Sequence, residues 1–103
     1  VDTPEQAAQV IRAMFALNLG HGAVFAVPVP EADAMTAEAA ERAINQAIAE
    51  AEAQGIHGKA VTPFLLARVA EITGGESRRA NTSLLINNSR VAAQIALALS
   101  HAE

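Results

Sequence analysis

One short apolar run most constrains the fold of this 103-residue chain. Residues 24–27 read Val-Phe-Ala-Val and are closed by Pro28 and Pro30, a pattern that predicts a buried β-strand. A single strand cannot satisfy its own backbone N–H and C=O groups, and the sequence offers no second convincing strand. We therefore expect the segment to complete a larger α/β domain, in which residues 24–27 join a sheet.

Helix-start and helix-stop residues predict four helices in the rest of the chain. Thr3 followed by Pro4, and Thr62 followed by Pro63, are typical of a capped helix start, and Gln6 stands where a capping box needs its reciprocal acceptor. The expected helices begin at Thr3, Thr36, Thr62 and Ser77, and end at Gly20 or Gly22, at Gln54 before Gly55, at Thr73 before Gly74 and Gly75, and at about Ser100. The residues expected on the inward face of the second helix are Ala39, Ala40, Ala43, Ile44, Ala47, Ile48 and Ala51.

The composition indicates a packed segment with a thin core. Hydrophobic residues make up 51% of the chain, which excludes a disordered tail. However, 25 residues are Ala and only 3% are aromatic, and each Ala buries little area. A chain this short also buries a modest share of its surface. We therefore expect a helix-rich α/β segment, with one strand and about four helices, that does not stand alone.

Charge and cysteine content exclude several classes of partner. The net charge is -4, and its basic residues are dispersed, whereas a nucleic-acid-binding surface needs a basic stripe and usually stacking aromatics. No apolar run is long enough to span a membrane, so neither nucleic acid nor membrane is an expected partner. The chain has no Cys, which excludes disulfides and is typical of a cytoplasmic protein.

Two amides share the apolar stripe of the expected last helix. At 100° per residue, Asn81 and Asn88 lie on one line and about 10 Å apart along the helix axis. The other residues on this line are Leu85, Ala92, Ile95 and Leu99. Because a buried amide must be paired, the two amides either anchor neighbouring backbone or reach a polar ligand such as a base edge or a ribose hydroxyl.

The remaining candidates for chemistry each have an ordinary structural reading. Residues 27–31 follow the expected strand, where open α/β sheets bind ligands, but two prolines also make a rigid turn. Lys59 beside Gly58 could approach a phosphate or lie in a solvated loop. Arg78 and Arg79 could meet an anion or a partner, or form a solvated corner. His21, His57 and His101 share no metal-ligand spacing, and we expect none of them to bind a metal.

Several motifs in one order resemble the pseudouridine-5'-phosphate glycosidases over nearly the whole chain. The most specific are the Thr62-Pro63-Phe64 block and the Asn81 and Asn87-Asn88 amides. The matching stretches are residues 1–5, 27–31, 58–66, 71–75, 80–81 and 87–88. The resemblance implies an α/β/α sandwich, of which residues 1–103 are the C-terminal segment of a single domain packed against the rest of that domain. It also implies a homotrimer.

The resemblance further implies an activity. The family reversibly cleaves the C–C glycosidic bond of pseudouridine 5'-phosphate to uracil and ribose 5-phosphate, and is classed with the carbon–oxygen lyases. It uses a covalent lysine, a glutamate acid/base and a divalent metal, typically Mn²⁺. No residue here matches those catalytic and metal positions. The expected substrate-binding residues are Asn81 first, then Asn87 and Asn88.

Two departures from the family pattern keep other readings open. Val27 stands where Asn is expected, and Thr82-Ser83 replaces an expected Ile-Ala pair. The alternatives are a diverged homologue of the indigoidine-biosynthesis type and a non-enzymatic helical interaction module. If the chain belongs to a glycosidase, we expect the isolated chain to be inactive. A Schiff-base mechanism needs a desolvated lysine, whereas Lys59 lies in a glycine-flanked loop.

Overall fold

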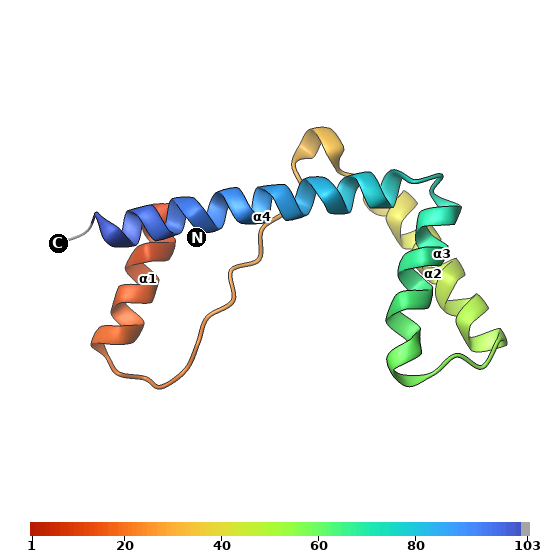
Figure 1. The fold of residues 1–103 in the computed structure, drawn as a ribbon, viewed down its shortest axis with the longest axis horizontal. Helices are drawn as coiled ribbons and strands as arrows, with labels where there is room; N and C mark the ends of the chain where they lie inside the picture. The colour runs from red at the N-terminus through yellow and green to blue at the C-terminus, as the bar shows by residue number, and fades with distance from the viewer. Residues whose placement is uncertain (102–103) are drawn as a thin grey trace. The chain divides into compact units, whose positions relative to one another are not determined.

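A computed structural model describes residues 1–101, which form four α-helices and two short 3₁₀ turns (Figure 1). The elements are α1 (Pro4–Ala16), η1 (Glu31–Asp33), α2 (Ala37–Ala53), η2 (Gly58–Ala60), α3 (Val61–Ile72) and α4 (Glu76–Ser100). The chain divides into two compact units. The terminal unit comprises residues 1–28 and the chain from Leu84 on, and the central unit comprises residues 29–83. No described helix is long and apolar enough to cross a membrane.

In the terminal unit, α1 begins as its sequence predicts. The Thr3 hydroxyl accepts the N–H of Gln6 at 3.2 Å, and Pro4 occupies the first helical position. The Gln6 side chain reaches back to the N–H of Asp2 at 2.7 Å rather than to that of Thr3, so the capping box closes one residue early. The helix ends at Ala16, a few residues before the expected glycine stop.

Helix α1 is tied to the last turns of α4 within the terminal unit. Arg12 donates from Nη2 to the carbonyl oxygens of Ala98 at 2.6 Å and Leu99 at 3.4 Å. A guanidinium at a helix C-terminus satisfies carbonyls that have no partner inside the helix and complements the helix dipole. Ala7 and Ala8 are buried on the same helix. The Arg12 guanidinium thus ties α1 to the end of α4.

The expected strand at residues 24–27 does not form within the described residues, so this prediction is wrong for the chain by itself. The segment is extended, without strand pairing in residues 1–101. Val24 is 96% exposed, whereas Phe25 and Val27 are half-buried. The physical reason is the one that makes a lone strand costly: no second strand lies in the described residues to receive its backbone groups.

In the central unit, α2 matches its predicted limits. The Thr36 hydroxyl accepts the N–H of Ala39 at 3.2 Å, and Gly55, at φ 67°, follows the C-cap Gln54. The buried face is an alanine row, which packs against α3. This row consists of Ala43, Ala47 and Ala51. Ile44 and Ile48, which were expected to face inward, are 45% and 40% exposed.

Two predicted helix caps, Thr62 and Ser77, do not cap α3 and α4. Helix α3 begins at Val61 directly after η2, so Thr62 is inside its first turn and caps nothing. Pro63 is tolerated there because the first N–H groups of a helix have no intrahelical partner. Helix α4 begins at Glu76, and Thr73 provides the cap expected of Ser77: its hydroxyl accepts the Ser77 N–H at 3.2 Å.

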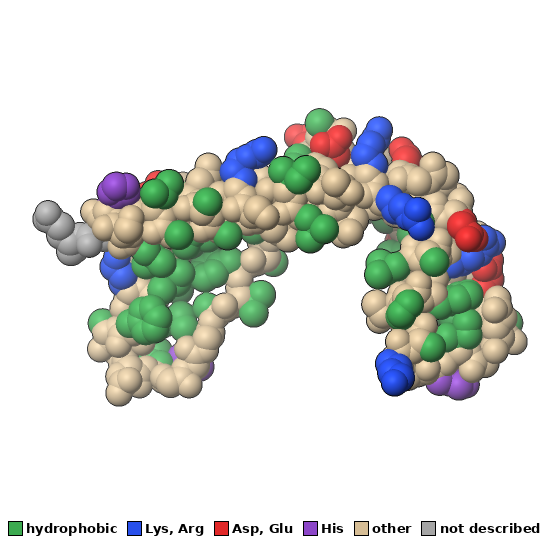
Figure 2. All heavy atoms as spheres, in the orientation of Figure 1, with side chains coloured by type: hydrophobic (Ala, Val, Ile, Leu, Met, Phe, Trp, Pro, Cys, Tyr) green, Lys and Arg blue, Asp and Glu red, His purple; other side chains and the backbone are tan. Residues whose placement is uncertain are grey.

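Every buried side chain among the described residues is an alanine. The seven are Ala7, Ala8, Ala43, Ala47, Ala51, Ala70 and Ala80. Large apolar side chains are at least partly exposed on both units, including Phe15 at 80% and Leu66 at 67%, and Figure 2 shows apolar surface over the helices. The thin core expected from composition is therefore present. An exposed apolar surface of this kind is typical of a segment that packs against further protein.

One charged cluster joins α2 to α3. The Arg68 guanidinium pairs through Nε and Nη2 with the Glu50 carboxylate, with Nη2 at 3.1 Å from Oε1, and through Nη1 with Glu71 at 2.8 Å. These bonds from Arg68, aided by one from Gln46, lower the pKa of Glu50. The carboxylates of Glu50 and Glu71 raise the pKa of Arg68.

Glu50→Gln is expected to lower the Tm of the chain slightly at pH 7. A carboxylate whose pKa is lowered by folding contributes stability above its unfolded pKa of about 4.3, and loses it as pH falls through the lower folded value. The difference between wild type and variant should therefore close below about pH 4. We expect a small effect because Arg68 and Glu50 are 33% and 29% exposed. Circular dichroism melts of wild type and variant at pH 7 and below about pH 4 test this. Equal Tm values at pH 7 would contradict it.

Candidate functional site

Asn81 lies on the rim of a hollow in the central unit. The hollow has a volume of about 670 Å³ and lies between α3 and the first turns of α4, with Ile44 of α2 at its edge. Its walls are mainly apolar, from Leu65, Leu66 and Val69. The polar groups around it are Thr62, Ser77, Arg78 and Asn81. Thr73 holds the N–H of Ser77 and so fixes the start of α4 beside the hollow.

This combination of groups has a definite chemistry. Apolar walls accept the face of a flat ring, while an amide offers a donor and an acceptor to the ring edge. A guanidinium and hydroxyl groups can hold an anion or a sugar hydroxyl. The hollow could therefore accept a polar ring that carries an anionic group.

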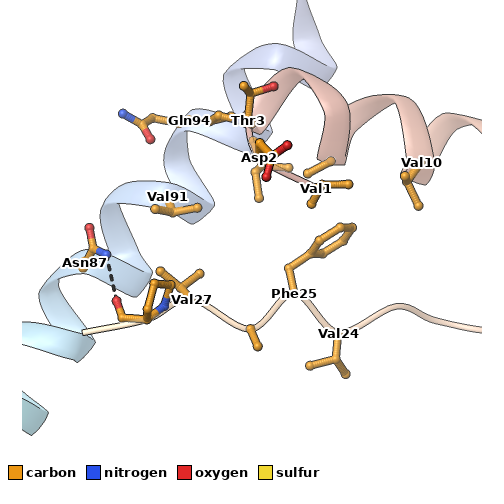
Figure 3. Close-up of a pocket in the computed structure, with 15 residues that line it drawn as sticks. Val1, Asp2, Thr3, Val10, Val24, Phe25, Val27, Asn87, Val91 and Gln94 are labelled. Carbon is orange, nitrogen blue, oxygen red and sulfur yellow. Dashed lines mark hydrogen bonds between the residues drawn. The ribbon is translucent and has the colours of Figure 1, made fainter. Parts of the chain in front are cut away.

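The other two candidate amides belong to the terminal unit. Asn87 donates from Nδ2 to the carbonyl oxygen of Pro28 at 3.2 Å (dashed line in Figure 3), so it anchors neighbouring backbone, a role that the sequence analysis considered for Asn81 and Asn88. Asn88 is half-buried and lines a second hollow of about 460 Å³ with Phe25, Val27 and Ile95 among its apolar neighbours. Asn81 and Asn88 thus do not share one hollow.

The stripe of α4 that was predicted to face inward is only partly buried. Asn81 is exposed, and Leu85 is 57% exposed. Only Asn88, Ile95 and Leu99 of the stripe are half-buried. The two amides lie on one helical line, but within residues 1–101 no protein layer covers the first half of this face. The substrate-binding role of the three amides remains a prediction.

A third hollow, of about 620 Å³, lies in the terminal unit between the start of α1, the extended segment and α4 (Figure 3). It is lined by Val1, Val10, Phe25 and Val91, with Asn87 and Gln94 as polar neighbours. The lining is largely aliphatic and carries one charged side chain, Asp2. Its character is that of a packing surface rather than of a site for a charged ligand.

Sequence reasoning missed one polar contact beside the proline-rich turn. Ser83 Oγ donates to Asp33 Oδ2 at 2.8 Å, which ties η1 to α4 within the central unit. In the sequence, Ser83 differs from the family pattern together with Thr82. No local signal predicts its partner, because the two residues are 50 positions apart. The contact fixes the turn that follows Pro30.

The other candidates are exposed and scattered. Lys59 is in η2, and His21, His57 and His101 lie in separate parts of the chain. Arg79 is exposed outside the hollow that Arg78 lines. In residues 1–101 no group of three or more His, Cys, Asp or Glu side chains could hold a metal ion. The position of the metal that the resemblance implies stays a prediction.

The fold is shared with part of a solved enzyme. The chain matches the crystal structure of a prealnumycin C-glycosynthase in complex with ribulose 5-phosphate with a TM-score of 0.82 and 37% sequence identity, over 97% of this chain and 33% of that one. The chain is therefore built like one part of a larger C-glycoside enzyme. The family described as "Indigoidine synthase A like protein" matches residues 1–98, and the chain belongs to that family.

Curated relatives carry the name given by the sequence resemblance, which is thereby confirmed. A pseudouridine-5'-phosphate glycosidase of Rhodospirillum centenum is 53% identical over 97 residues, which are 94% of this chain and 30% of the relative. One of Escherichia coli is 50% identical over 95 residues, which are 89% of this chain and 30% of the relative. The chain thus spans about a third of the length of the proteins that it matches.

Proposed function

We propose that this chain forms part of an enzyme that reversibly cleaves the C–C glycosidic bond of pseudouridine 5'-phosphate, giving uracil and ribose 5-phosphate. The observation that carries the proposal is 53% identity, over 94% of this chain, to a relative named for that activity. The chain spans about a third of the relatives' length, so in this proposal the rest of such an enzyme lies outside these residues.

In this proposal Asn81 holds the uracil or the sugar. Its amide can match a carbonyl and an N–H on the base edge, and the apolar wall from Leu65, Leu66 and Val69 can cover the ring face. Asn87 and Asn88 remain candidates for substrate contact in the terminal unit. Asn87 already supports the chain near Pro28, so its contribution would be mainly to position that turn.

The chemical steps are assigned to no residue described here. The family's lysine adduct, acid/base glutamate and Mn²⁺ ligands have no matching positions, and the described residues hold no metal-binding cluster. We propose that the intact enzyme is a homotrimer that binds Mn²⁺ through other residues. A cytoplasmic location is supported by the absence of Cys and by a nucleotide substrate.

A chimera tests the proposal directly. In the R. centenum relative, the matching 97 residues are replaced by the aligned residues of this chain, which gives a full-length protein called the chimera below. We expect the chimera to release uracil from pseudouridine 5'-phosphate, measured by chromatography, within about tenfold of the parent rate, because in this proposal the residues of the chemical steps come from the unchanged part of the parent. We expect the isolated 103-residue chain to release none, because it supplies no desolvated lysine.

The outcomes separate the alternatives. A chimera that is folded but inert would contradict the proposal and favour the helical interaction module. A chimera that leaves pseudouridine 5'-phosphate uncleaved but joins ribose 5-phosphate to another ring through a C–C bond would favour a diverged homologue, as in the C-glycosynthase match. Uracil release by the isolated chain would overturn the assignment of catalysis to other residues.

A further inference from the structure

The hydroxyl groups of the chain's four serines differ in their partners. Ser83, Ser89 and Ser100 each donate from Oγ to an oxygen atom of the protein, at 2.8 to 3.0 Å. Two of these bonds run to a carbonyl of the preceding helical turn, as is common for serine in helices. Among the residues that the structure describes, Ser77 has the only serine hydroxyl without such a partner.

The backbone of Ser77 is nevertheless held in place. The Thr73 hydroxyl accepts the Ser77 N–H at 3.2 Å and itself donates to the carbonyl oxygen of Val69 at 2.7 Å, in the short turn that joins α3 to α4 (Figure 1). Thr73 thus provides the helix cap that the sequence pattern assigns to Ser77. The Ser77 hydroxyl is therefore uncommitted, although it is carried on a fixed and half-buried residue.

Ser77 and Asn81 lie on one face of α4 and line the same hollow. Residues four apart in a helix are surface neighbours, with Cβ atoms about 5 to 6 Å apart. No buried side-chain N or O atom in residues 1–101 lacks a hydrogen-bond partner, so the unpaired Ser77 hydroxyl is open to the hollow rather than sealed in protein. A hydroxyl and an amide at this spacing match two polar atoms on one edge of a six-membered ring.

The apolar wall of the hollow favours a flat ring over a sugar phosphate. The wall comes from Leu65, Leu66 and Val69 of α3. The face of a base is apolar and gains by leaving water against such a wall. A ribose 5-phosphate carries hydroxyl groups and a charged phosphate, which would lose water there without gaining partners. The polar edge and the apolar wall together therefore suit a nucleobase.

We propose that Ser77 is a further substrate-binding residue that acts on the base. Its hydroxyl donates to one carbonyl oxygen of uracil, while the Asn81 amide pairs with a carbonyl and an N–H on the same edge of the ring. The inference rests on the proposed function for the identity of the base. It goes beyond that proposal by adding Ser77 to the site and by assigning the hollow to the base rather than to the sugar.

Binding of the two products to the folded chimera tests this assignment. We expect Ser77→Ala to raise the Kd for uracil, measured by NMR titration, by about five- to tenfold, because one neutral hydrogen bond is lost. Ser77→Thr keeps the hydroxyl and should stay within about twofold of the unmodified chimera. The Kd for ribose 5-phosphate should stay within about twofold in both variants. An unchanged Kd for uracil in Ser77→Ala, a loss confined to ribose 5-phosphate, or a chimera that binds no uracil would overturn the proposal.

The matched control is Ser89→Ala. This variant removes the same hydroxyl from the same helix, at an exposed position that lines none of the three hollows described above, and should leave both Kd values unchanged. The Tm of Ser77→Ala should also be unchanged, because the Ser77 hydroxyl holds no other residue and Thr73 keeps its own bond to the Ser77 N–H. A lowered Tm with a normal Kd for uracil would make Ser77 a structural residue and overturn the proposal.

The same variants separate this inference from the proposed function. Uracil binding that depends on Ser77, in a chimera that releases no uracil, would contradict the proposed function and leave this inference standing. Uracil release with an unchanged KM and an unchanged Kd for uracil in Ser77→Ala would do the reverse. If the chimera does not fold, variants with Ala, Ser and Thr at the aligned position of the parent relative give the same decision.

Discussion

Asn81→Ala in the chimera is expected to lower kcat/KM for pseudouridine 5'-phosphate by about tenfold to a hundredfold. The amide lies on the rim of a hollow with apolar walls, where it can pair with the edge of a base. A site that loses such a match leaves polar groups of the substrate unpaired. The Tm should change little, because Asn81 is exposed.

The control for this variant is Arg79→Ala. Arg79 is an exposed residue on the same helix and does not line the hollow, so its removal should leave kcat/KM within about twofold of the unmodified chimera. Tm and kcat/KM are measured on the same preparation. An Asn81→Ala chimera that is destabilised by about 1 to 3 kcal/mol, with normal turnover per folded molecule, would instead make Asn81 a structural anchor.

Ala47→Asp is expected to destroy the packing of α2 on α3. Ala47 is 0% exposed at the centre of the buried alanine row. A carboxylate there would have to be desolvated and would force the helices apart, with a cost of about 4 kcal/mol or more. Chemical denaturation of the chimera measures the loss, and an unchanged midpoint would contradict the buried position.

Ala49→Asp separates burial from helix propensity. Ala49 lies on the same helix, two residues further on, and is exposed. The variant adds the same side chain to a solvated position, so it should cost only about 0.5 kcal/mol from the poorer helix propensity of Asp. The difference between the two variants measures the burial of Ala47 alone. Similar losses in both would mean that the outer face of α2 is covered in the full-length fold.

Local sequence signals predicted the elements whose causes are local. Thr3 and Thr36 cap α1 and α2 as expected, because an N-cap needs only a side chain and an N–H three residues away. The same rule failed at Thr62 and Ser77, where neighbouring turns shift the helix start. At α4 the competing cap, Thr73, lies before two glycines, so the connection is tighter than a simple stop-and-start pattern implies.

Features that depend on distant residues were predicted less well. The strand at residues 24–27 is predicted from a continuous apolar run, but a strand exists only with a partner, and none lies in the described residues. The candidate site was likewise predicted only in its local features. The helical positions of Asn81 and Asn88 could be computed from sequence, yet the anchoring of Asn87 to Pro28 and of Ser83 to Asp33 requires the fold.

The all-alanine interior has a consequence for calorimetry. The heat capacity change of unfolding reflects the apolar surface that is newly exposed to water, and is about 12 to 15 cal/mol/K per residue for ordinary domains. Within residues 1–101 the seven buried side chains are all alanines, and the Leu, Ile and Phe surface is already partly hydrated. The heat capacity step and the denaturant m-value of the chain should therefore both fall below those of a domain of equal length. Its stability would then vary little with temperature, and its unfolding transition would be broad rather than sharp.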